Sequence, residues 1–170
     1  MSVLLILVLV TLGLLAAGAM GVRRLRPWPV AVRGGIAAMF TATGVSHFVG
    51  MRGTLIDMVP PALPAPELLV TVTGVLELAG VVGLLWHRTA PWAAGGLSLL
   101  LVAMFPANVY AAQSGLLTAW DDQLWPRTAQ QVIFLAATLA VVVHAVRSRR
   151  REAQPLPADA DPSPAHTGPR

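Results

Sequence analysis

Apolar residues form five long segments along the chain, and short stretches rich in proline, arginine or other polar residues separate them. Each segment has about the 20 residues that an α-helix needs to cross the hydrocarbon core of a bilayer. The pattern therefore predicts an all-α membrane protein with five transmembrane helices. These predicted helices cover about residues 2–20, 30–49, 67–86, 92–112 and 126–146.

Prolines predict where these helices are separated and how they are shaped. Prolines on both sides of Trp28 end the first helix before the second begins. Residues 51–66 hold four of the chain's fourteen prolines, which predicts an ordered loop at the membrane interface rather than a continuous helix. Pro66 then starts the third helix, and Pro106 predicts a kink in the fourth.

The second apolar segment is less hydrophobic than the first and carries glycine, hydroxyl and histidine side chains. Small residues let helix backbones approach closely, and hydroxyl groups form hydrogen bonds between helices. Phe40, Thr43, Gly44 and His47 share one helix face because they are spaced by three or four residues. We expect this face to pack against protein rather than lipid.

Basic residues, all of them arginine, gather at alternate ends of the predicted helices. Arginines near membrane spans are concentrated on the cytoplasmic side, so the richer side is predicted to be cytoplasmic. The chain is thus expected in the cell (plasma) membrane with its N-terminus outside and its C-terminus in the cytoplasm. The inner arginines are Arg23, Arg24, Arg26, Arg33, Arg88, Arg147, Arg149, Arg150 and Arg151, and Arg52 and Arg127 lie outside.

The chain is expected to divide into three regions. Residues 1–21 form an N-terminal transmembrane helix, which can act as a signal anchor. A cleaved signal peptide is the alternative, but no basic residue precedes the apolar run. Residues 28–147 form a four-helix membrane domain, and residues 148–170, rich in Pro, Ala and Asp, form a disordered cytoplasmic tail.

Composition agrees with a membrane protein and excludes several functions. Hydrophobic residues make up 55%, charged residues 12%, and the mean hydropathy is +0.67, whereas soluble domains carry about 25% charged residues. The absence of cysteine excludes disulfides, thiol redox chemistry and cysteine-ligated iron–sulfur or zinc sites. The net charge of +4 comes from arginines at membrane boundaries, so we expect no nucleic-acid partner.

Glu77 is the most informative single residue, because it stands in the middle of the third apolar segment. A rise of about 1.5 Å per residue puts it near the bilayer midplane. A charged side chain there costs at least about 2.5 kcal/mol on insertion scales. We therefore expect Glu77 to be protonated, paired or facing a polar cavity inside the bundle.

Other polar side chains are predicted at depths compatible with that of Glu77, in the outer half of the membrane. Some share helix faces through their four-residue spacing, as Thr73 does with Glu77 and Arg127 does with Gln131. Together they are predicted to form a polar pocket that opens to the outer side. The candidate site residues are His47, Thr73, Glu77, Asn108, Arg127 and Gln131.

A metal or haem site is not expected. Only His47, Glu77 and Asp57 could converge, and no paired-histidine spacing is present. The remaining membrane-associated histidines, His87 and His144, lie at the cytoplasmic end, too far from His47 to share a haem.

Five short motifs follow one another in a fixed order over about residues 30–146. They are Gly44-Val45-Ser46-His47-Phe48, the run MVPPALP from Met58 to Pro64, Thr73-Gly74-Val75-Leu76-Glu77, Phe105-Pro106-Ala107-Asn108-Val109-Tyr110, and Pro126-Arg127 with Gln130 or Gln131. In combination and spacing they resemble the DoxX-like membrane protein family. The resemblance implies a compact four-helix membrane bundle, preceded in this chain by an additional N-terminal helix.

What this resemblance implies about function is diverse. Members of the DoxX-like family include a subunit of an archaeal thiosulfate:quinone oxidoreductase and a mycobacterial protein associated with a membrane oxidoreductase complex. Others act in the maturation of methylamine dehydrogenase or as animal receptor-assembly chaperones. The resemblance therefore implies the fold and the position of the site more strongly than it implies a reaction.

Two functional hypotheses stay open. In the first, the chain is a subunit of a membrane redox complex that binds a quinone or another isoprenoid lipid in the polar pocket. His47 would relay protons and Glu77 would accept them, with Thr73, Asn108, Arg127 and Gln131 as binding groups. Because nothing in the chain carries electrons, such an oxidoreductase subunit would need a redox protein partner or a bound cofactor.

In the second hypothesis the chain is not an enzyme but an assembly or stabilising subunit for a partner protein in the membrane. The same polar groups then hold its own helices, or those of the partner, together by hydrogen bonds. A small-solute transporter is disfavoured, because the chain shows no inverted repeat and no matching pair of interrupted helices.

Overall fold

The computed structural model describes residues 2–115 and 123–152, and within these ranges the protein is all-helical. The six α-helices are α1 (Ser2–Ala19), α2 (Trp28–Ser46), α3 (Arg52–Asp57), α4 (Pro66–Leu85), α5 (Ala90–Gln113) and α6 (Leu124–Glu152). A short 3-10 helix, η1 (Arg23–Leu25), connects α1 to α2. The predicted helical class is therefore confirmed for the described residues.

Three helices in the described part of the chain, α4, α5 and α6, are long and apolar enough to cross a membrane by length and composition. These helices indicate a membrane protein. Helix α1 is apolar but slightly shorter, and α2 carries Arg33 next to Gly34 and Gly35 within its 19 residues. Membrane crossing by α1 and α2 stays a prediction.

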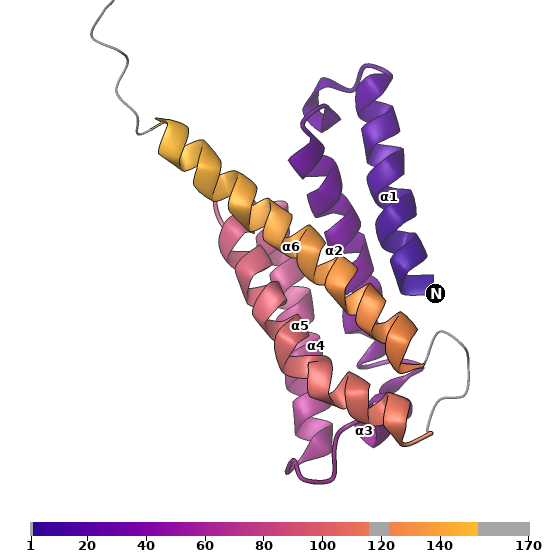
Figure 1. Cartoon of the computed structure of the whole chain (residues 1–170). Coiled ribbons are helices and arrows are strands. Elements are labelled where there is room, and N and C mark those ends of the chain that lie inside the picture. The colour runs from indigo at the N-terminus through magenta and orange to yellow at the C-terminus, as the bar shows by residue number, and fades with distance from the viewer. Residues whose placement is uncertain (1, 116–122, 153–170) are drawn as a thin grey trace, which may run out of the picture.

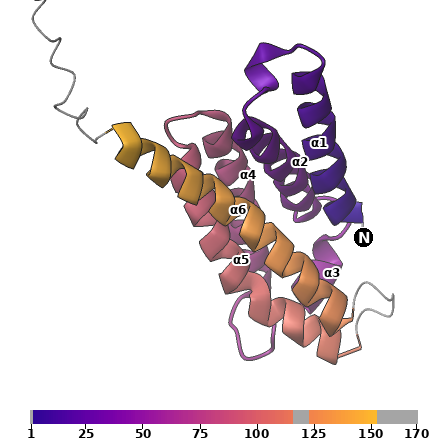
Figure 2. The same ribbon diagram turned by 45° about the horizontal axis from the view of Figure 1, so that its top comes forward.

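Helix α2 is the centre of the packing, because it contacts α1, α4 and α6. Helix α5 packs against both α4 and α6. Both views place α1 beside α2 on one side of the bundle and α5 with α6 on the other (Figures 1 and 2). One buried apolar cluster joins these helices, formed by Leu7, Ile36, Ala37, Met39, Phe40, Leu84, Ala94, Leu97, Leu101 and Val141.

Contacts at one end of the bundle bring the basic segments together. The guanidinium of Arg33 donates hydrogen bonds to the Leu84 carbonyl, including one of 3.0 Å from Nε. The rings of Trp28 and His144 meet edge to face with centroids 5.2 Å apart. The start of α2 therefore lies beside the end of α4 and the C-terminal part of α6. We call this the basic end, and its arginines are Arg23, Arg24, Arg26, Arg33, Arg88, Arg147, Arg149, Arg150 and Arg151.

Two predicted boundaries differ from the structure. Residues 51–66 are not a loop throughout, because the six-residue helix α3 forms before the prolines begin. Helix α6 continues to Glu152, so the first residues of the tail predicted from 148 are helical. Arginine favours helix, and basic side chains in the last turn interact well with the negative end of the helix dipole. The rest of that predicted tail, residues 153–170, lies outside the described residues.

Pro106 lies inside α5, as expected. Proline has no N–H to donate and its ring clashes with the preceding turn, so it bends a helix. The C-terminal part of α5 turns away from the direction of its first turns (Figure 1). This bend carries the end of α5 toward the start of α6.

Glycines set the distance between α2 and α4. A Cβ atom at Gly74 would lie 2.6 Å from Cβ of His47, and one at Gly44 would lie 2.8 Å from Cδ2 of Leu78. Cβ atoms do not approach so closely, so a larger residue at either position forces the two helices apart. The predicted face of α2 that carries Gly44 and His47 therefore does pack against protein.

The Gly74→Ala variant tests this close approach. We expect a loss of about 1–3 kcal/mol of stability, the usual cost of overpacking, measured by thermal unfolding in detergent with circular dichroism. Gly95→Ala in α5 is the matched control, because among the described residues no atom of another helix lies within 4 Å of its added Cβ. Equal stability of the two variants would contradict the described packing of α2 on α4.

Candidate functional site

Glu77 is held at the interface between α4 and α2. Only 1% of its surface is exposed. Its Oε2 atom lies 2.6 Å from Oγ1 of Thr43, which donates a hydrogen bond to it from α2. A carboxyl group buried in an apolar helix requires such a partner, because the hydrocarbon core of a membrane offers no water to hydrate it. Glu77 is thus hydrogen-bonded across two helices, which agrees with the expectation that it has a partner.

His47 bonds the backbone carbonyl of the same threonine. It lies at the C-terminal end of α2, is 6% exposed, and its Nδ1 is 2.9 Å from the carbonyl oxygen of Thr43. A carbonyl can only accept, so this hydrogen bond requires the proton on Nδ1. Thr43 therefore contacts both predicted site residues, through its hydroxyl and its carbonyl.

The Thr43 hydroxyl suits either protonation state of Glu77. When Glu77 is ionised, the hydroxyl donates to it over 2.6 Å. When Glu77 is protonated, the carboxyl can donate to Oγ1 instead, and the hydroxyl can turn toward the Phe40 carbonyl, 3.3 Å away. The interface can thus hold or release a proton at Glu77 without leaving the Thr43 hydroxyl unpaired.

A second polar group lies between α5 and α6. Nη1 of Arg127 donates a hydrogen bond of 3.0 Å to Oδ1 of Asn108. Nε2 of Gln131, one turn further along α6, donates a bond of 2.5 Å to the Leu101 carbonyl. These three side chains therefore tie the start of α6 to α5 on both sides of Pro106.

Thr73 does not take part in either group. Its hydroxyl donates to carbonyl oxygens of its own helix, at 2.9 Å to Leu69 and 3.1 Å to Val70. Its four-residue spacing from Glu77 is correct, but a threonine hydroxyl within a helix can bond the carbonyl one turn earlier. The Thr73 hydroxyl therefore bonds its own helix and not the Glu77 carboxyl group.

Five of the six predicted residues thus lie in two groups rather than one, and Thr73 lies in neither. Within residues 2–115 and 123–152, no hydrogen bond links the His47–Glu77 group to the group that contains Arg127. Two hollows lie between helices, and none of the six residues lines either one. The sequence predicted how deep each polar side chain lies in the membrane, but not the direction in which it points from its helix. That direction separates the two groups.

Two residues of the site were not among the predicted ones. Thr43 supplies the partner of Glu77, and its position four residues before His47 on the same face was the available signal. Arg52, in α3, donates from Nη1 to the His47 carbonyl over 3.2 Å and from Nη2 to the Thr71 hydroxyl over 3.1 Å. Its role depends on α3, whose folding back onto α4 gave no signal in the sequence.

The chemistry that this arrangement offers is limited to protons and hydrogen bonds. His47 and Glu77 are two side chains that can carry a proton, and both bond Thr43. Among the described residues no three His, Cys, Asp or Glu side chains gather in a way that could hold a metal ion. The site can exchange a proton or fix two helices.

One known protein family matches most of the chain. Residues 36–149 match the model of a family described as Domain of unknown function (DUF8561). The chain belongs to this family. The matched range of this DUF8561 domain runs from α2 into α6 and includes all six predicted site residues. No curated protein and no solved structure matches the chain. The DUF8561 match gives no link to the DoxX-like family, so that resemblance stays a prediction.

A double-mutant cycle tests the Thr43–Glu77 hydrogen bond in this DUF8561 protein. Thr43→Val and Glu77→Leu should be coupled by about 0.6 kcal/mol, and at most about 1.7 kcal/mol, as measured for polar pairs in membrane bundles. Thermal unfolding in detergent gives the four stabilities. Thr43→Ser is a control that keeps the hydroxyl group, and Glu77→Gln is a control that keeps an acceptor oxygen. The stability of both variants should stay near that of wild type. Additive effects of the two removals would show that the bond does not stabilise the protein.

Proposed function

We propose that this DUF8561 protein crosses the plasma membrane five times, with a DoxX-like bundle of α2, α4, α5 and α6 preceded by α1. The apolar surface of α1 supports this reading, since Leu5, Leu9 and Leu12 are all more than half exposed. Such side chains are suited to lipid. The only charged group within α2, Arg33, is hydrogen-bonded to a carbonyl at the end of α4, so part of its hydrogen-bonding capacity is satisfied within the bundle.

The gathering of arginines at one end supports an orientation. With nine arginines at the basic end and Arg52 and Arg127 toward the opposite end, the positive-inside rule makes the basic end cytoplasmic. The N-terminus of α1 then lies outside the cell, and the end of α6 lies in the cytoplasm.

We further propose a non-catalytic role, as an assembly or stabilising subunit for a partner protein in the same membrane. The observation that carries this proposal is that the polar side chains form hydrogen bonds between helices. Among the described residues, each hydrogen bond between two side chains joins two different helices: Thr43–Glu77, Arg52–Thr71, Ser98–Thr138 and Arg127–Asn108. These groups are engaged in holding the bundle together, and Glu77 is only 1% exposed and lines neither of the two hollows between helices.

The outer surface of the bundle is consistent with this role. Most residues in the apolar windows of α4, α5 and α6 are not buried within the described chain. On α4, for example, Val72, Val75 and Val82 are each more than 40% exposed. A rigid helical core with an apolar outer surface can pack against the membrane helices of a partner as readily as against lipid.

A redox-linked quinone or isoprenoid subunit is the second candidate. One observation favours it: a buried carboxyl is more than helix packing requires, since a hydroxyl or amide would also pair with Thr43. The two proton arrangements available at Thr43 and Glu77, with His47 bonded to the same threonine, suit a group that takes up a proton when a quinone is reduced. This role would need an electron-carrying partner.

Cysteine labelling tests the proposed orientation, because the chain has no cysteine of its own. Ala62, between α3 and α4, and His87, between α4 and α5, are both exposed. A membrane-impermeant maleimide added to intact cells should label Ala62→Cys and leave His87→Cys unlabelled until the cells are broken. The opposite pattern would invert the topology, and equal labelling would show that α4 does not cross the membrane.

Tagged protein purified from its own membrane tests the proposed function. Mass spectrometry should recover a stoichiometric membrane-protein partner with wild type and with Glu77→Gln, because an amide at residue 77 still accepts from Thr43. The partner's level should fall when this chain is deleted and return with either version. Glu67→Gln, the same chemical change at an exposed residue in the first turn of α4, is the matched control.

The same experiment separates the two candidates. Recovery of a quinone or isoprenoid with wild type and Glu67→Gln but not with Glu77→Gln would replace the assembly role by the redox role. If neither a partner nor such a ligand is recovered, and no membrane protein changes its level on deletion, both candidates fail.

A further inference from the structure

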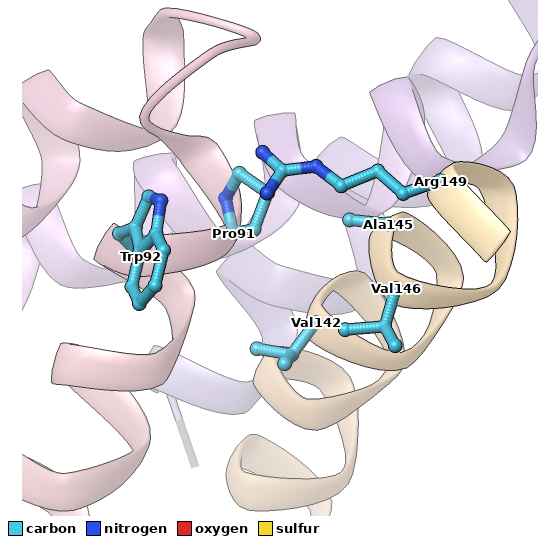
Figure 3. A pocket seen from close by; sticks show the side chains of 6 residues that line it. All are labelled: Pro91, Trp92, Val142, Ala145, Val146 and Arg149. Carbon is cyan, nitrogen blue, oxygen red and sulfur yellow. The ribbon is translucent and has the colours of Figure 1, made fainter. Parts of the chain in front are cut away.

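A hollow opens between α5 and α6 at the basic end of the bundle. It has a volume of about 130 Å³. Its lining residues are Pro91, Trp92, Val142, Ala145, Val146 and Arg149. Figure 3 shows that the Arg149 side chain extends from α6 toward Pro91, while Val142 and Val146 project from the same helix nearby. None of the residues discussed for the candidate site above belongs to this hollow.

The lining has two chemically different parts. Arg149 provides one guanidinium group, and among residues 2–115 and 123–152 it has no hydrogen bond or ion pair. The other lining side chains are apolar, except that the indole ring of Trp92 also carries an N–H group. A ligand that fits both parts carries a negative charge at one end and hydrocarbon at the other.

Trp92 places this hollow at a membrane boundary. It is 75% exposed, and Trp86, at the end of α4, is 68% exposed. Exposed tryptophans at the ends of membrane helices lie at the level of lipid headgroups, because the ring is amphipathic. An occupant of the hollow at this level therefore has its charged end among headgroups and its apolar end toward the hydrocarbon core.

Charge around the hollow also selects the occupant. The basic end carries nine arginines, and the only acidic residue described near them is Glu152, at the last position of α6. Within the described residues none of these arginines forms an ion pair. Basic pockets between membrane helices bind the headgroups of anionic lipids. A soluble phosphate would gain nothing from the apolar walls, and a zwitterionic lipid would gain less from the arginines.

We infer that the hollow between α5 and α6 binds an anionic phospholipid. Its phosphate is held by Arg149, and the first part of an acyl chain lies against Val142 and Val146 beside Trp92. This site is separate from the Thr43–Glu77 interface and does not depend on which function that interface serves.

Native mass spectrometry of the full chain tests this site. The protein is released from nanodiscs that contain equal amounts of phosphatidylglycerol and phosphatidylcholine, and the retained lipids are counted. Wild type should retain phosphatidylglycerol in preference to phosphatidylcholine, and Arg149→Gln should lower that retention about fivefold. Arg151→Gln is the matched control, because two residues along a helix turn its side chain about 200° away from the hollow.

A second variant separates a defined site from general attraction to positive charge. Ala145→Leu fills the hollow and keeps every arginine, so it should also lose the retained phosphatidylglycerol. Glycerol phosphate, which has the charge without acyl chains, should not compete. Equal losses in Arg149→Gln and Arg151→Gln, full retention in Ala145→Leu, or equal retention of the two lipids by wild type would each overturn the inference.

Discussion

Polar groups inside an apolar helical bundle must find their partners on neighbouring helices, and this requirement governs the structure. Glu77 is its clearest case, because burial leaves the carboxyl 1% exposed and Thr43 on α2 supplies the hydrogen bond. That bond requires α2 and α4 to lie close together. Gly44 and Gly74 allow the approach, since a side chain at either position would meet atoms of the opposite helix.

The same principle divides the bundle into two chemically distinct ends. Toward the end where α2 finishes, hydrogen bonds from Arg52 and Arg127 connect different helices. At the basic end, the guanidinium of Arg33 bonds the end of α4, and within the described residues the arginines of α6 stay available to the membrane surface. The two ends therefore meet their surroundings differently, one through internal pairing and one through charge and exposed tryptophans.

A closed polar interface and an apolar outer surface together suit a protein that supports others in the membrane. Catalysis on a quinone needs room for the ring beside the proton-carrying groups, whereas Thr43, Glu77 and His47 are packed against one another. The protonatable pair keeps the redox alternative chemically reasonable, because Thr43 can pair with Glu77 in either protonation state. Membership in a family of unknown function adds no preference between the two.

The sequence alone determined the helical class, the approximate helix positions and the gathering of arginines at one end. These features follow from local pattern: apolar length, proline placement and charge next to apolar segments. Phe40, Thr43, Gly44 and His47 were also correctly expected on one packed face, because the spacing of residues along a single helix is a local property. The continuation of α6 to Glu152 was missed because the arginine-rich stretch resembled the polar tail that follows it.

Only the tertiary structure decided which polar groups meet. Depth along each helix can be estimated from residue number, but the rotation of one helix relative to another depends on packing of the whole bundle. That rotation pairs Glu77 with Thr43, and Arg127 with Asn108. It also creates the hollow between α5 and α6, whose walls are far apart in the sequence. Local pattern determines the helices, and the contacts between their faces determine the sites.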